Sequence, residues 1–160
     1  MAFDRRMFIA TAATSVAAAS AAVLAQSAEA PGVTLAKSLY AAFGKGDVAT
    51  IVNACTSDVD WEVVGRSSDF PSFGARKGQS GVKEFFEAVG AHCTFTEFAP
   101  KEFFAVGDKV FVLGQYGITV KKTSKSFSSA WLHVFTIADR KVKGFMESTD
   151  TAKGAEAYRG

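Results

Sequence analysis

The second half of the 160-residue chain alternates apolar and polar residues over four long stretches, and this alternation limits the folds available. It begins at Thr94, ends at Thr149, and is interrupted only near Gly107, Lys121 and Ala138. A period of two predicts β-strands, and we place them at 94–106, 109–120, 125–138 and 141–149. Because consecutive strands joined by short turns pair side by side in opposite directions, the pattern predicts an antiparallel meander.

The residues before this meander predict mainly helices. Apolar side chains spaced three and four apart indicate helices over 33–43 and 78–90, with a short helix capped by Asp47 between them. The stretch 58–65 alternates and predicts a strand, whereas 66–78 is rich in Gly, Ser and Pro and predicts a loop. Helices followed by a mainly antiparallel sheet indicate the α+β class. About 130 residues lie beyond the N-terminal segment, enough for one domain.

Both faces of the predicted sheet are apolar. In the third long strand one face carries Phe127, Trp131, His133 and Phe135, and the other carries Ala130, Leu132 and Val134. The helices can cover only one face of the sheet. We therefore expect a second copy of the chain to cover the other face, which predicts a homodimer.

The first 30 residues predict a signal peptide. Arg5 and Arg6 precede Phe8 and an uncharged, Ala-rich stretch, an arrangement that resembles a twin-arginine export signal. Small residues allow cleavage after Ala25 or after Ala30. The stretch is too short and too weakly apolar for a membrane span. We therefore expect a domain over 31–160 in the periplasm, without membrane association after cleavage.

Composition argues against several classes of function. The net charge of +2, with scattered Lys and Arg, does not favour binding to nucleic acid. With only His92 and His133, and no metal-ligand spacing, a zinc site is not expected. Cys55 and Cys93 fit either two buried thiols or a disulfide formed in an oxidising compartment.

Five short motifs resemble the ketosteroid-isomerase-like (NTF2-like) superfamily, and its SnoaL-like members in particular. They lie, in the family's order, at 40–47 (YAAFGKGD), 59–65 (VDWEVVG), 78–86 (GQSGVKEFF), 131–136 (WLHVFT) and 147–151 (ESTDT). The resemblance implies a cone-shaped fold, in which a curved, mainly antiparallel sheet wraps helices around an internal pocket. It implies no cofactor. Because such folds carry many activities, the resemblance does not by itself define the reaction.

The steroid isomerases of this superfamily pair an Asp base with an oxyanion hole of Tyr and protonated Asp, a system used as a general example of pKa tuning. Transferring that pattern places Leu39 at the Tyr position and Leu132 near the second Asp. The base position falls on Glu62 or Val63. Without the oxyanion hole, we do not expect steroid isomerase activity.

The SnoaL-like cyclases suggest a different site. Their resemblance to this chain points to His133 and Glu147 as an acid/base pair, with Glu62 as a third candidate. A two- or four-residue turn at 138–141 would place His133 and Glu147 on opposite faces, and the sequence leaves this register open. A hydrogen-bonded structural His and an exposed strand carboxylate remain the alternatives.

Three large aromatic residues are candidates for the walls of a pocket: Trp61, Tyr116 and Trp131. Two functions follow from these residues. The first is an exported acid/base isomerase, cyclase or (de)hydratase that acts on a small, largely apolar ligand. The second is a non-catalytic homodimeric module that binds a small molecule or another protein. A pocket shared by His133 and a carboxylate would favour the enzyme.

Overall fold

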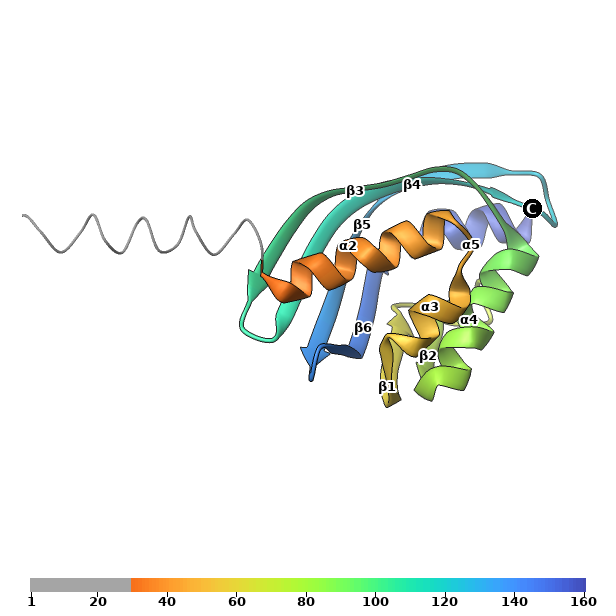
Figure 1. The fold of residues 1–160 in the computed structure, drawn as a ribbon. Coiled ribbons are helices and arrows are strands. Elements are labelled where there is room, and N and C mark those ends of the chain that lie inside the picture. Colours follow the sequence, from red (N-terminus) through yellow and green to blue (C-terminus); the bar gives the residue numbers. More distant parts are fainter. Residues whose placement is uncertain (1–29) are drawn as a thin grey trace, which may run out of the picture.

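The computed structural model describes residues 30–160, which form an α+β domain with a curved sheet wrapped around helices (Figure 1). The predicted signal peptide lies almost entirely outside these residues. The elements follow one another as α2 (Pro31–Gly44), α3 (Val48–Asn53), β1 (Cys55–Val63), β2 (Gly74–Lys77), α4 (Gly78–His92), β3 (Cys93–Val106), β4 (Lys109–Val120), β5 (Ser126–Ala138), β6 (Lys141–Thr149) and α5 (Thr151–Arg159). None of the described helices has the length and apolar content needed to cross a bilayer.

The six strands form one sheet in the order β2-β1-β6-β5-β4-β3. All neighbours are antiparallel except β1 and β6, which run parallel. The predicted meander is thus β3 to β6, and its strands begin and end within a residue of the predicted bounds. The parallel pairing places β1, which the sequence left without a partner, beside the last strand of the meander.

Helix α2 lies along the concave side of the sheet beneath β3, β4 and β5 (Figure 1). Pro31 suits its first turn, where no intrahelical N–H bond is lost. Its buried face consists of Val33, Ala36, Leu39 and Ala42, each three residues after the one before. Helix α4 packs against β1, and α3 lies between α2 and α4. The helices therefore cover the concave face of the sheet, and a site can lie between this face and the helices.

Two elements differ from the sequence-based expectation. The predicted loop 66–78 contains the strand β2, which pairs antiparallel with β1. Four residues are too few to show a period of two. The chain also ends in a helix, α5, whose many small residues carry little apolar pattern. The Asp150 carboxylate accepts a hydrogen bond from the Lys153 N–H at the start of α5, as expected of a helix cap.

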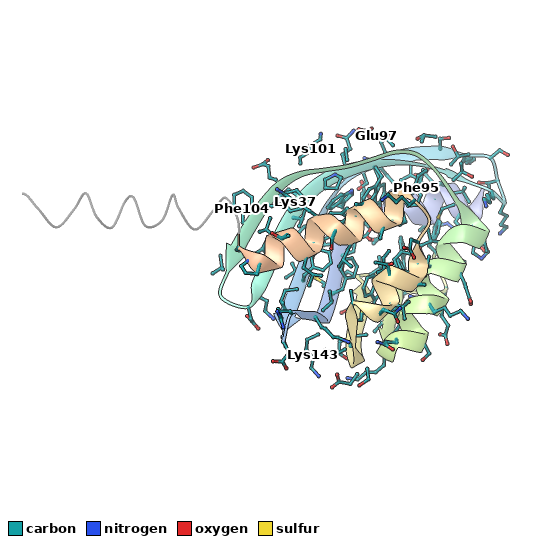
Figure 2. All side chains as sticks on the ribbon, in the orientation of Figure 1. Lys37, Phe95, Glu97, Lys101, Phe104 and Lys143 are labelled. Atoms are coloured by element: carbon teal, nitrogen blue, oxygen red, sulfur yellow. The ribbon has the colours of Figure 1, made fainter. Side chains whose placement is uncertain are left out.

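The convex face of the sheet has no helix over it (Figure 1). Leu113 is 41% exposed and Phe104 is 48% exposed, whereas Leu132 and Val134 are half-buried. Figure 2 shows Phe104, Glu97 and Lys101 at the outer edge of the molecule along β3. This face combines apolar and charged side chains, and the dimer that it suggested remains a prediction.

Candidate active site

The hairpin between β5 and β6 decides which side chains face the concave side. Ala138 pairs with Lys141 across a two-residue turn, in which Asp139 and Arg140 both have positive φ. Such a turn alone would place His133 opposite Met146. However, Lys143 forms a bulge that shifts the pairing by one residue.

The bulge brings His133 directly opposite Glu147, with both side chains on the concave face. The separation between His133 Nε2 and Glu147 Oε2 is 3.3 Å. The two residues are only 4% and 9% exposed. Despite this distance, the alignment is not that of a hydrogen bond, and His133 Nε2 has no hydrogen-bond partner among residues 30–160. No residue of the described chain therefore uses the hydrogen-bonding capacity of this ring nitrogen.

Two tyrosines hold the pair from opposite sides. The Tyr40 hydroxyl on α2 lies 2.9 Å from His133 Nδ1. Tyr116 on β4 donates a hydrogen bond of 3.3 Å to Glu147 Oε1. Burial, followed by the negative charge of Glu147, raises the pKa of both phenols well above its usual range. Both tyrosines therefore keep their protons at neutral pH and act as donors. When Tyr40 donates to Nδ1, the proton of a neutral His133 lies on Nε2, facing Glu147.

A chain of hydroxyl groups supports Tyr116. Its oxygen lies 2.7 Å from Thr149 Oγ1, and Thr149 donates to Ser129 Oγ at 2.9 Å. Ser129 donates to the Ala130 carbonyl and accepts the Asp150 N–H at the start of α5. Ser129 uses its hydroxyl proton on the Ala130 carbonyl, and Thr149 uses its own on Ser129. The Tyr116 hydroxyl therefore supplies the single proton that Thr149 and Glu147 share. The long bond to Glu147 leaves that carboxylate with lone pairs to accept another proton.

The His133 ring lies flat against Trp131, with ring centroids 3.9 Å apart and planes 19° apart. Phe98 stacks on Trp131 at 5.4 Å. The indole of Trp131 is close to the backbone of Gly114 on β4, where a Cβ would lie 2.6 Å from Trp131 Cε2 and closer still to two other ring atoms. Because glycine has no Cβ, the Trp131 indole fits against the backbone at Gly114 and packs against the imidazole of His133.

The pair faces a mostly apolar hollow, which we call the inner cavity. It offers about 80 Å³ to the centre of a water-sized molecule. His133 and Glu147 line it together with Tyr40 and Tyr116, and the other walls are mostly phenylalanines and aliphatic residues from α2, α4 and the sheet. Trp61 also lines it, and its indole N–H has no partner in the described chain. The inner cavity is thus an apolar chamber with one polar end.

The predicted site residues fall into three groups. His133, Glu147, Trp61 and Tyr116 all line the inner cavity. Trp131 stands behind His133 and contacts its ring. Glu62 is exposed, because Trp61 and Val63 on either side of it take the inward positions of β1. The structure therefore does not bring Glu62 to the other two candidates.

Sequence reasoning missed Tyr40, Thr149 and Ser129. Tyr40 lies one position beyond Leu39, where the isomerase pattern had placed a tyrosine, so a shift of one residue would have found it. No comparable signal marks Ser129 and Thr149, which are ordinary strand residues until the fold brings them together. In residues 30–160 no three His, Cys, Asp or Glu side chains cluster as metal ligands would. Both cysteines are free and buried.

The fold and this cavity define the class of protein: an NTF2-like α+β domain whose sheet and helices surround an apolar cavity. The chain belongs to the SnoaL-like domain family, whose model matches residues 36–145. This confirms the resemblance drawn from the motifs. Among curated proteins, none matches the chain significantly in sequence.

Solved structures show the same fold. An NTF2-like protein of unknown function from Burkholderia pseudomallei has 23% sequence identity and a TM-score of 0.76, covering 82% of this chain and 100% of its own. An NTF2-like protein from Burkholderia xenovorans has 26% identity and a TM-score of 0.73, covering 80% and 95%. TerC, co-crystallised with polyporic acid, has 24% identity and a TM-score of 0.73, covering 82% and 100%.

Proposed function

We propose that this protein is an acid/base enzyme that isomerises, cyclises, hydrates or dehydrates a small organic ligand held in the inner cavity. The observation that carries the proposal is the buried pair of His133 and Glu147, whose facing atoms are 3.3 Å apart at the polar end of an apolar chamber. A buried His and carboxylate in a closed pocket are suited to proton transfer near neutral pH.

The geometry assigns a role to each group. Glu147 accepts a proton from a carbon next to a carbonyl group, and the electron pair moves onto the carbonyl oxygen. The His133 Nε2–H donates a hydrogen bond to that oxygen, in the tautomer that a Tyr40 donor favours. In an isomerisation, Glu147 then returns the proton to another carbon. In a dehydration, it gives the proton to a β-hydroxyl group, which leaves as water while the enolate electron pair forms the carbon–carbon double bond, and hydration is the reverse of this step. In a cyclisation, the enolate carbon attacks a second carbonyl carbon of the ligand, and the oxygen of that carbonyl takes the proton from Glu147. Tyr40 and Tyr116 position the pair by holding the far atom of each group.

The family supports a general role in small-molecule binding or cyclase and isomerase chemistry. TerC provides a specific parallel, since that protein was co-crystallised with polyporic acid. For this chain, the apolar walls and single polar end favour a neutral, largely apolar ligand, because no Lys or Arg of the described chain lines the cavity to neutralise an anion.

The experiment that tests the proposal is exchange of the α-protons of 2-butanone, a small ketone that suits the inner cavity, in D₂O followed by NMR. We expect the wild-type protein to accelerate exchange above the buffer rate. Glu147→Gln should lower the rate by about 100-fold or more, the usual contribution of a general base. His133→Phe should also lower it, whereas His92→Gln, outside the cavity, is the matched control. Exchange at the buffer rate with wild-type protein, or at the full rate in Glu147→Gln, would refute the proposal.

A second candidate function is a non-catalytic homodimeric module for small-molecule binding or protein interaction. The uncovered convex face supports it, because Leu113, Phe104 and their half-buried neighbours form an apolar surface that a second copy could cover. Light scattering of the purified domain would test the dimer. We expect a dimer mass, and Leu113→Glu should shift the mass to a monomer while Glu87→Gln, on the exposed side of α4, should not. A monomer mass for the wild-type domain would contradict this proposal.

We also propose that the protein is exported to the periplasm by the twin-arginine route. The support is the sequence alone, in Arg5, Arg6 and the Ala-rich stretch that follows. Fractionation and intact-mass measurement should find a periplasmic protein that begins at Gln26 or Pro31. Replacing both arginines with lysine should keep the full-length precursor inside the cell. Normal processing of that variant would exclude this route.

A further inference from the structure

A second hollow, which we call the outer cleft, opens beside the inner cavity. Its walls come from Gly44 at the end of α2, Val48 at the start of α3, Gly90 near the end of α4 and Pro100 on β3. Phe95 borders both hollows, and Figure 2 shows it near the end of α2. The outer cleft is thus adjacent to the chamber that holds His133 and Glu147.

Three phenylalanine rings separate the two hollows. Phe43 lies edge-on to Phe98 at 4.8 Å and to Phe95 at 5.3 Å between ring centroids. All three residues line both the inner cavity and the outer cleft. Together with Phe86, which also lines both, they form an aromatic partition between the two spaces. Rings of this kind can turn aside for a ligand more easily than a strand can move.

The size of the inner cavity limits what it can hold alone. An apolar cavity of about 150 Å³ accepts one benzene molecule, whereas the inner cavity offers about 80 Å³. Ligand pockets usually measure about 300–1,000 Å³. A ligand of benzene's size or larger that places a polar group at His133 and Glu147 must therefore extend beyond the chamber, and the outer cleft offers about 520 Å³ on the far side of the partition.

The chemistry of the outer cleft indicates which part of a ligand it takes. Among the described residues that line it, none is charged, and only Tyr40 and Cys93 carry polar side-chain atoms. We propose that the outer cleft binds the apolar tail of an elongated, amphipathic ligand whose polar head lies against His133 and Glu147. The position of the head rests on the proposed function, whereas the tail site stands on the cleft itself.

Two glycines allow the proposal to be tested without disturbing the core. A Cβ at Gly90 or at Gly44 would meet no atom within 4 Å, and neither residue has a positive φ. Larger side chains can therefore be added at two positions that line the cleft without strain. Glu87, one turn before Gly90 on α4, lines neither hollow and provides a matched control position.

The experiment measures the affinity of 1-alkanols from pentanol to octanol by calorimetry, with the fluorescence of Trp61 and Trp131 as a second readout. A buried methylene group strengthens binding about fourfold. We expect this gain at each step for the wild-type protein and for Glu87→Phe. In Gly90→Phe, and independently in Gly44→Leu, pentanol should bind as in the wild type while the gain per methylene disappears.

Three results would overturn the tail site: no measurable binding of any alkanol, a full gain per methylene in both cleft variants, or an equal loss of affinity for short and long alkanols. Failure of the proposed function would look different. Glu147→Gln and the wild type would then exchange 2-butanone protons equally slowly, while the alkanol series kept its dependence on chain length. The two ideas can therefore fail separately.

Discussion

Replacing Gly114 with Ala should displace the imidazole of His133 without touching it. The new Cβ would lie 2.6 Å from Trp131 Cε2 and closer to two other atoms of the indole, so the ring must move away from β4. Because Trp131 and His133 stack at 3.9 Å, movement of one ring disturbs the other. The change is therefore small in chemistry but directed at the polar end of the inner cavity.

The energetic cost can be bounded from the structure. Adding a methyl group to a filled core position costs about 1–3 kcal/mol. Replacing a strand glycine with alanine returns about 0.5–1 kcal/mol through reduced backbone entropy. We expect a net destabilisation of about 1–2 kcal/mol, which for a domain of this size lowers the Tm by about 3–8 °C.

Two measurements check this expectation. Thermal unfolding gives the Tm, and proton NMR reports the ring-current shift of the His133 C–H protons above the indole. His92, the other histidine, packs edge-on against Tyr158 and provides an internal reference. Gly90→Ala, where a Cβ has open space, is the control and should be neutral or stabilising. An unchanged Tm together with unchanged His133 shifts in Gly114→Ala would show that Trp131 does not fix the imidazole.

Three further predictions concern the same site. His133→Phe should destabilise the domain by about 3 kcal/mol or more, because it leaves Glu147 buried without its partner. In denaturant unfolding, the double variant His133→Phe/Glu147→Leu should recover most of that loss. Equal losses of stability in the single and double variants would show that the two groups do not interact. Ser129→Ala should cost about 1–2 kcal/mol, since it leaves the Asp150 N–H and the Thr149 hydroxyl without a partner, and a variant with unchanged urea midpoint would contradict this. Burial raises the pKa of the Cys55 and Cys93 thiols from 9.0 to about 11. Because the unfolded chain loses these protons first as the pH rises, the free energy of unfolding should fall between pH 9 and pH 11. The Cys55→Ala/Cys93→Ala variant should show a shallower fall, and a pH profile identical to that of the wild type would refute this cause.

The long strands of this fold could be predicted because their side chains alternate over 9 to 14 residues. By contrast, β2 has only four residues, and its place is set by pairing with β1 rather than by its own pattern. The parallel contact of β1 with β6 is likewise a tertiary choice that no local signal encodes. Local periodicity therefore predicts elements well and their long-range partners poorly.

The site shows the same division. The resemblance to SnoaL-like proteins identified His133 and Glu147, but their common face depends on the bulge at Lys143, which the sequence did not reveal. Glu62 looked equally suitable as a carboxylate, yet its position in the alternation of β1 turns it to solvent. Tyr40 was overlooked because a pattern transferred from relatives can be displaced by a single residue.

The bulge at Lys143 also affects how such a site can vary among related chains. An extra residue within a strand normally turns every following side chain to the other side. In this hairpin the irregularity is confined between Val142 and Gly144, and the pairs from Thr136–Gly144 to Trp131–Thr149 keep one constant register. Removing Lys143 would let the two strands pair regularly with His133 still opposite Glu147. The hairpin tip can therefore gain or lose this residue over generations while the chemistry at its base is inherited unchanged.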